Sequence, residues 1–125
     1  RTEFMPFAPI ILDKFAKDYL NINNELDNYK YMTITCYCKP LMISKAPASV
    51  HVDKTARPQI VSQKENRRLY KILSEYYKLS GVPVLINTSF NMHEEPIVFT
   101  PQDAIRAFLD GNLDYLIINN FVIQK

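Results

Sequence analysis

Short polar side chains follow an apolar run near residue 86, and they are one place where this sequence could do chemistry. Residues 82–86 predict a buried strand, and the polar side chains come directly after it: Asn87, Thr88, Ser89 and Asn91. In open α/β sheets, ligands bind at the carboxyl ends of strands, where hydroxyl and amide groups can bind phosphate or ribose oxygens without burying a charge. The same residue types are favoured turn formers, and composition alone favours a plain turn.

A second candidate lies around His51. In an extended segment His51 and Asp53 would project to the same side, with Thr55 and Arg57 close by. An imidazole, a carboxylate and a guanidinium in a small space can bind a phosphate or steer a proton. The alternative is a surface strand edge whose polar residues face water. A triad of Ser89, His51 and Asp53 can also be written, but the sequence offers no sharp nucleophile turn to support it.

Metal-ligating residues form weaker patterns, and we predict no metal site. Cys36 and Cys38 lack the two-residue gap and the second pair of a zinc site, and alternation places both thiols on an apolar face. We therefore expect buried structural cysteines and a reducing compartment. His93 beside Glu94 and Glu95 could ligate a cation, although a solvated loop is the favoured interpretation.

Hydrophobic periodicity predicts the elements that must position these residues. Spacing of three and four residues predicts helices over 12–20, from residue 62 or 66 to 80, and over 101–110. Alternation and short apolar runs predict strands over 31–38, 50–52, 60–61, 82–86, 95–99, 116–118 and 121–123. The fold class is therefore α/β or α+β with a mixed sheet, in one domain over residues 1–125.

Local signals define several boundaries. The helix that Gly81 closes opens either at the Ser62 capping box or at Asn66. Thr100 followed by Pro101 and an aspartate in the first turn predicts the start of the last helix. Residues 119–120, both asparagine, predict the turn between the last two strands.

Composition excludes several classes of function. The chain has 125 residues and only two glycines, so neither a Walker loop nor a G-x-G-x-x-G fingerprint can be present. Its basic residues are scattered among acidic ones and the net charge is +2, so we expect no nucleic-acid partner. No apolar run approaches the roughly 18 residues that span a bilayer, so we expect no membrane partner and a cytoplasmic location.

Together the two polar segments and their neighbours resemble the C-terminal domain of the carbamoyltransferase family that includes nodulation protein U and antibiotic-tailoring O-carbamoyltransferases. The matching stretches keep the family's order and are spread over nearly the whole chain: residues 1–9, 31–33, 51–59, 81–91, 95–98 and 100–104. The resemblance implies a fold like the YrdC-type domain, an open twisted mixed sheet with helices, here without its N-terminal portion.

The resemblance also implies a reaction. The YrdC-like domain would make carbamoyladenylate from carbamoyl phosphate and ATP with Mg²⁺, releasing pyrophosphate. A kinase-like ATPase domain of the same polypeptide, which carries an iron site and is absent here, would pass the carbamoyl group to a small-molecule hydroxyl acceptor whose identity is unknown. By itself this fragment is expected to be inactive.

Eight residues receive roles from the resemblance, chiefly as donors and cations that hold two anions together. Arg1 resembles the arginine of the family's K-x-R element, and Ser89 and Asn91 resemble its nucleotide-side serine and asparagine. The candidate catalytic residues are Arg1, Arg57, His51 and Asp53, and the candidate nucleotide-binding residues are Thr55, Asn87, Ser89 and Asn91.

Three positions depart from the family pattern, in which glycine is usual at Lys54, Glu94 and Asn119. If those glycines serve positive φ, Asn119 substitutes easily, whereas Lys54 and Glu94 would each be strained by roughly a kcal/mol or more. Two other functions also stay open, the first from the YrdC-like resemblance and the second from these glycine losses. One is a nucleotide- or RNA-binding YrdC-like module, and the other is a structural domain with an inactive site.

Overall fold

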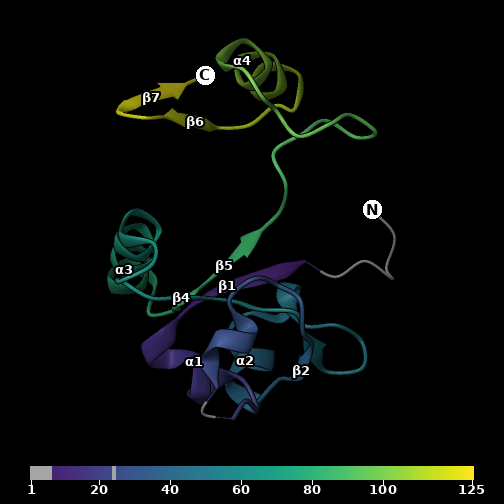
Figure 1. Cartoon of the computed structure of the whole chain (residues 1–125), viewed down its shortest axis with the longest axis vertical. Helices are drawn as coiled ribbons and strands as arrows, with labels where there is room; N and C mark the ends of the chain where they lie inside the picture. The colour runs from purple at the N-terminus through teal and green to yellow at the C-terminus, as the bar shows by residue number, and fades with distance from the viewer. Residues whose placement is uncertain (1–6, 24) are drawn as a thin grey trace. The chain divides into compact units, whose positions relative to one another are not determined.

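The computed structural model describes residues 7–23 and 25–125, and it confirms a mixed α+β class (Figure 1). The chain divides into two compact units, Arg1–Thr88 and Ser89–Lys125. The polar segment after residue 86 therefore contributes residues to both units.

A three-stranded sheet of the order β4-β1-β5 lies at the centre of the first unit. The middle strand, β1 (Ala8–Leu12), is parallel to β4 (Gln59–Val61) and antiparallel to β5 (Val84–Asn87). All five residues of β1 are buried, so no alternation reveals this strand in the sequence. Proline is rare in a central strand, but the pairing with β4 begins only at Ile10, so Pro9 lies outside the parallel ladder.

Helices cover both faces of this sheet (Figure 1). Two helices, α1 (Asp13–Tyr19) and α2 (Pro40–Lys45), pack on one face, and α3 (Arg67–Ser80) packs on the other. Alternation along β1 divides the core between the faces. The first cluster includes Ile11, Ala16, Tyr19, Leu20, Met42, Ile60 and Val84, and the second contains Ile10, Leu12, Val61 and Leu73.

The ends of α3 follow local rules. Of its two possible start signals, Asn66 is the N-cap, because its side-chain oxygen accepts the Leu69 N–H at 3.1 Å. Ser62 instead donates its hydroxyl to the Glu65 carboxylate at 3.0 Å. Gly81 ends the helix at φ 70°, as predicted.

Several predicted strands are shorter or absent. Of residues 31–38 only β2 (Cys36–Tyr37) is a strand, and it pairs antiparallel with β3 (Thr55–Ala56). Residues 50–52 lead into a turn, and residues 95–99 form no strand. Alternation of apolar and polar residues shows only that successive side chains could face opposite sides of an extended segment. A strand also needs a neighbouring backbone with which to form hydrogen bonds. Short 3₁₀ helices, η1 (Leu26–Tyr29) and η2 (Pro47–Ser49), complete the first unit.

The second unit packs one helix on a hairpin. Its helix is α4 (Pro101–Asp110), and its strands β6 (Tyr115–Ile118) and β7 (Phe121–Gln124) pair antiparallel about the predicted asparagine turn. Asn119 has a φ of 53°, a conformation that asparagine tolerates. The small core of this second unit consists of Ala104, Phe108 and Leu116, with Phe90, Val98, Ile118 and Ile123 packed against it.

The predicted start of α4 at Thr100 is confirmed, and its cap is a reciprocal capping box. The Thr100 hydroxyl accepts the Asp103 N–H at 3.1 Å, and the Asp103 carboxylate accepts the Thr100 N–H at 3.0 Å. Apolar spacing along α4 would also place Ile105 and Leu109 beside Phe108 on the buried face, but they are 42% and 51% exposed, whereas Phe108 is buried. No helix in the described part of the chain is long and apolar enough to cross a bilayer.

Candidate functional site

Residues 51–55 form a tight turn that leads into β3. The Lys54 N–H donates to the His51 carbonyl at 2.9 Å, and the His51 N–H donates to the Thr55 carbonyl at 2.8 Å. Lys54 closes the loop at φ 64°, the left-handed conformation that a three-residue hairpin loop with a bulge requires at this position. The predicted extended strand is therefore wrong here, whereas the positive φ considered for Lys54 is present.

Asp53 organises this turn. One of its carboxylate oxygens accepts the Thr55 hydroxyl at 2.6 Å and the Thr55 N–H at 2.9 Å. The same oxygen lies 3.2 Å from Nδ1 of His51. These contacts, with the Thr55 hydroxyl first, lower the pKa of Asp53 below its usual value. Asp53 is therefore a carboxylate at neutral pH that holds the other two side chains in place.

His51 is oriented by that carboxylate. Its side chain is half-buried, and Nδ1 faces Asp53, so the tautomer that donates from Nδ1 leaves Nε2 with a lone pair. In its neutral form the ring can accept a proton at Nε2, and in its charged form it can donate to a phosphate oxygen. The predicted grouping of His51, Asp53 and Thr55 is thus present, although a turn rather than a strand produces it.

Arg57 lies in the short connection between β3 and β4. It is exposed, and its guanidinium forms no hydrogen bond or ion pair with any residue that the structure describes. A planar guanidinium with uncommitted N–H groups is suited to bidentate recognition of a phosphate or carboxylate. Arg1, the other predicted cation, lies outside the described residues.

Asn87 ends β5, and its amide group is already engaged. Nδ2 donates to Oε1 of Gln59 at 2.9 Å and approaches Sδ of Met32 at 3.8 Å. Gln59 begins β4, so this contact links the two outer strands of the sheet across β1. Oδ1 is the atom of the Asn87 side chain that can still meet a ligand.

Ser89 and Asn91 belong to the second unit. Ser89 is exposed, and its hydroxyl forms no hydrogen bond with the residues that the structure describes. Asn91 is half-buried, and its amide donates to the backbone carbonyls of Met92 and Glu95, each at 2.9 Å. Asn91 therefore holds its own loop together, and only Oδ1 remains for a ligand.

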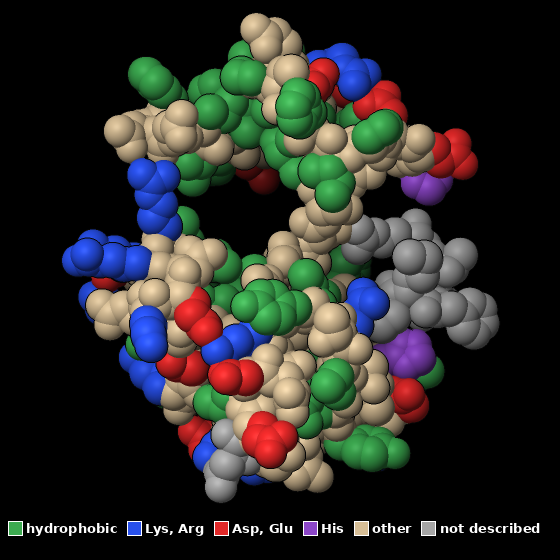
Figure 2. Space-filling view, viewed as in Figure 1, with side chains coloured by type: hydrophobic (Ala, Val, Ile, Leu, Met, Phe, Trp, Pro, Cys, Tyr) green, Lys and Arg blue, Asp and Glu red, His purple; other side chains and the backbone are tan. Residues whose placement is uncertain are grey.

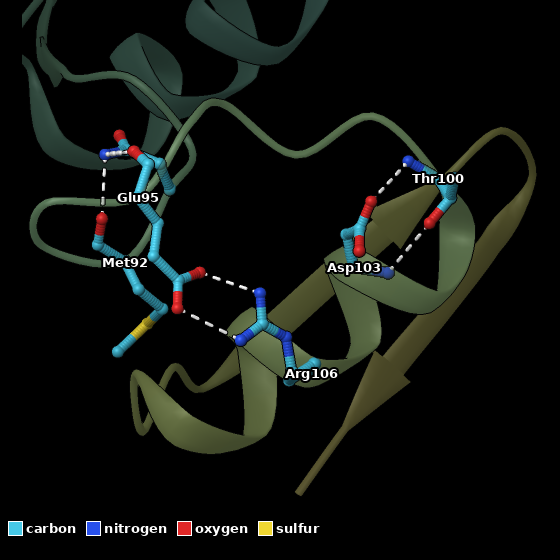
Figure 3. A network of polar contacts seen from close by, with 6 residues as sticks. Met92, Glu95, Thr100, Asp103 and Arg106 are labelled. Carbon is cyan, nitrogen blue, oxygen red and sulfur yellow. Dashed lines mark hydrogen bonds and ion pairs between the residues drawn. The ribbon is translucent and has the colours of Figure 1, made fainter.

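The segment after Asn91 is fixed to α4. Glu95 forms a two-pronged ion pair with Arg106, with oxygen–nitrogen distances of 2.7 and 3.0 Å (Figure 3). Glu94 has a φ of 63°, so this second departure from the family pattern also lies at a left-handed position. Neither Arg106 nor Gln59 was assigned a role from sequence. Gln59 lies in a stretch that carries the resemblance, but no local pattern joins residues 95 and 106.

The cysteines are consistent with structural residues. Cys36 is buried in the first cluster, and Cys38 is half-buried. Burial raises the pKa of Cys36 to about 12 and that of Cys38 to about 11. Within residues 7–23 and 25–125 no three His, Cys, Asp or Glu side chains group as metal ligands would. His93 and Glu94 are both strongly exposed, with 4.0 Å between Nε2 and the nearer carboxylate oxygen.

Charge on the first unit is mixed. On its face in Figure 2, lysine and arginine side chains are interspersed with aspartate and glutamate. The view shows no continuous basic stripe on that face, which is what binding along a nucleic-acid backbone would need.

Comparison with known proteins adds the deciding observation. The family model described as carbamoyltransferase C-terminus matches residues 1–125. The chain belongs to the carbamoyltransferase C-terminus family. Two similar proteins carry nodulation names: nodulation protein NolNO of Sinorhizobium fredii is 34% identical over the whole chain, and nodulation protein U of Rhizobium tropici is 35% identical. An uncharacterised protein of Methanocaldococcus jannaschii is 43% identical over the same 125 residues.

The family match confirms the resemblance that the sequence motifs carry. The chain spans about a quarter or less of each relative, with 24%, 18% and 21% of the length covered in the Methanocaldococcus, NolNO and Rhizobium tropici proteins. Most of the length of these relatives therefore lies outside the region that this chain matches.

Proposed function

We propose that this chain forms part of an ATP-dependent carbamoyltransferase and contributes to making carbamoyladenylate from carbamoyl phosphate and ATP. Membership of the carbamoyltransferase C-terminus family over residues 1–125 carries the proposal. The turn around Asp53 supports it, because it offers a fixed carboxylate, an oriented imidazole and a nearby uncommitted guanidinium on one short segment.

The proposed reaction has three balanced steps. Water breaks the bond between the carbonyl carbon and the bridging oxygen of carbamoyl phosphate, which gives carbamate and inorganic phosphate. A carbamate oxygen then bonds to the α-phosphorus of ATP, and the bond to the β-phosphate breaks, so pyrophosphate leaves. An acceptor hydroxyl finally attacks the carbonyl carbon of carbamoyladenylate, loses its proton and releases AMP. No protein nucleophile is required.

The chain's own residues would hold anions and move protons. The Arg57 guanidinium would bind a phosphate oxygen and stabilise the charge that develops during transfer. Nε2 of His51, oriented through Asp53, can take the proton of the attacking water. Oδ1 of Asn87 and of Asn91 and the Ser89 hydroxyl can accept or donate to ribose and phosphate groups. A single carboxylate such as Asp53 can also meet Mg²⁺ that is bound chiefly through phosphates.

At Lys54 and Glu94 the backbone keeps a conformation that glycine, the usual residue there in the family pattern, could also adopt. Lys54 and Glu94 keep positive φ values of 64° and 63° although each carries a side chain. A chain free of constraint would relax such strain into an ordinary conformation, whereas strained residues persist where the surrounding contacts demand them. The alternative of an RNA-binding module finds no support in the mixed charge of Figure 2.

The proposal is tested on the full-length protein. We expect conversion of ATP to AMP and pyrophosphate only when carbamoyl phosphate is present, and we expect Arg57→Ala to reduce that rate by about 100-fold, as the loss of one charge-stabilising donor typically does. The matched control is Arg67→Ala, because Arg67 is also exposed and lies in the first turn of α3. ATP turnover that ignores carbamoyl phosphate, or equal losses in both variants, would contradict the proposal.

A further inference from the structure

The loop that begins the second unit is built by its own polar groups. The Glu95 N–H donates to the Met92 carbonyl at 3.1 Å, and the Val98 N–H donates to the Phe90 carbonyl at 3.0 Å. With the two bonds of the Asn91 amide, this gives residues 90–98 a defined path without any regular helix or strand. The path matters because Ser89 and Asn91 are two of the candidate nucleotide contacts.

One ion pair ties this path to a regular element. Arg106 projects from α4 and meets both carboxylate oxygens of Glu95, as Figure 3 shows. Glu95 is itself the residue whose backbone carbonyl accepts the Asn91 amide. The helix end nearest the loop is fixed independently by the Thr100–Asp103 capping box in the same figure. Displacing the Glu95 side chain would therefore disturb the backbone to which Asn91 is bonded.

We propose that Glu95 and Arg106 are positioning residues that set the geometry of the Ser89–Asn91 nucleotide contacts through the Asn91–Glu95 hydrogen bond. This inference rests on the proposed function, and it assigns roles to two residues that would touch neither ATP nor carbamoyl phosphate. The bidentate geometry is specific to arginine, because a lysine ammonium meets a carboxylate as a single point and leaves the loop free to rotate about it.

Exposure separates a positioning role from a stabilising one. Arg106 is 54% exposed and Glu95 is 40% exposed at the side chain, so solvent screens the pair and the global stability should depend on it only weakly. The pair can still decide how often the loop is in its binding-competent form, and ligand affinity falls in proportion to that fraction. An exposed pair near the upper end of the usual range would change that fraction about fivefold.

The test uses kinetics of the full-length protein, with AMP formation in the presence of carbamoyl phosphate as the signal. We expect Glu95→Ala and Arg106→Lys each to raise the KM for ATP about fivefold, with less than about a twofold change in the KM for carbamoyl phosphate. The charge-exchanged double variant, Glu95→Arg with Arg106→Glu, should recover most of the ATP affinity. Hydrogen exchange over residues 90–98 should accelerate in both single variants and slow again in the double variant.

The matched control is a second exposed pair, Glu75 with Lys78 on α3, which also joins at 2.7 Å. Glu75→Ala should leave both KM values unchanged. Variants of Glu95 and Arg106 with wild-type KM for ATP, or with equal rises in both KM values, overturn the positioning role while leaving the proposed function intact. A wild-type protein that makes no AMP overturns both, so the two failures are distinguishable.

Discussion

Replacing Lys54 by glycine should stabilise the protein. Lys54 is exposed and occupies the left-handed position that closes the 51–55 turn. Its backbone carbonyl accepts the Cys38 N–H at 2.8 Å, and its own N–H donates to His51, so the φ is fixed from two directions. Glycine can make the same backbone bonds without a Cβ that clashes in this conformation.

The magnitude is the difference between two effects. The left-handed conformation costs a residue with a Cβ about 1–2 kcal/mol. Glycine loses about 0.5–1 kcal/mol more backbone entropy than alanine when it folds. The expected net gain for Lys54→Gly is therefore about 0.5–1 kcal/mol, or a rise of roughly 2–4 °C in Tm. Lys54→Ala keeps the strained φ and should change stability by less than about 0.5 kcal/mol.

The assay is urea-induced unfolding of the 125-residue chain, followed by tyrosine fluorescence. The first unit holds every tyrosine except Tyr115, so this signal reports mainly on the unit that contains Lys54. The midpoint should rise for the glycine variant and stay near wild type for the alanine variant, at equal m values. If glycine proves no more stable than alanine at this position, the assignment of strain to the left-handed φ is wrong.

Two further predictions concern the same unit. Because the Thr55 hydroxyl is the main cause of the low Asp53 pKa, Thr55→Val should raise that pKa toward its usual value in a carboxylate NMR titration, whereas Thr33→Val should not. Because the pKa of Asp53 is lowered in the folded protein, its contribution to stability is present above pH about 4 and is lost as the pH falls through the folded pKa. An unchanged Asp53 pKa in the Thr55 variant would contradict this account. Leu73→Ala should lower the free energy of unfolding by about 2–4 kcal/mol, since Leu73 is fully buried. The control Leu79→Ala, at an 89% exposed position of the same helix, should change it by less than about 0.5 kcal/mol. Similar losses in the two variants would refute the assigned core.

Features that depend on neighbours in sequence could be predicted. The Asn66 cap was one of two proposed starts, and the Gly81 end, the Thr100 capping box and the asparagine hairpin all appear where local rules place them. Each involves backbone groups within a few residues of one another, so the sequence alone contains the information. The turn at Asp53 is intermediate, because the sequence groups its residues correctly but alternation predicts a strand where the structure has a turn.

Features that depend on contacts between residues far apart in the sequence could not be predicted. β1 carries no alternation because helices cover both faces of its sheet, and its place between β4 and β5 joins segments about 50 and 75 residues apart along the chain. The bond between Asn87 and Gln59 exists only because those strands flank β1. The pair of Glu95 with Arg106 likewise spans a loop that no periodic pattern describes. The sequence identifies these polar side chains, but the tertiary fold determines which residues they contact.

Those contacts divide the candidate residues into two kinds. Asn87 and Asn91 are half-buried, and their side-chain N–H groups donate to other groups of the protein. Asn87 therefore stabilises a strand end, and Asn91 stabilises a loop. Arg57 and Ser89 are exposed and keep their donors free of the residues that the structure describes. Preorganised sites need both kinds of residue, because a donor stabilises a ligand fully only when the residues around it hold it in a fixed position. For the proposed function, the Arg57 guanidinium and the Ser89 hydroxyl would meet the ligands, whereas each asparagine first supports its own strand end or loop.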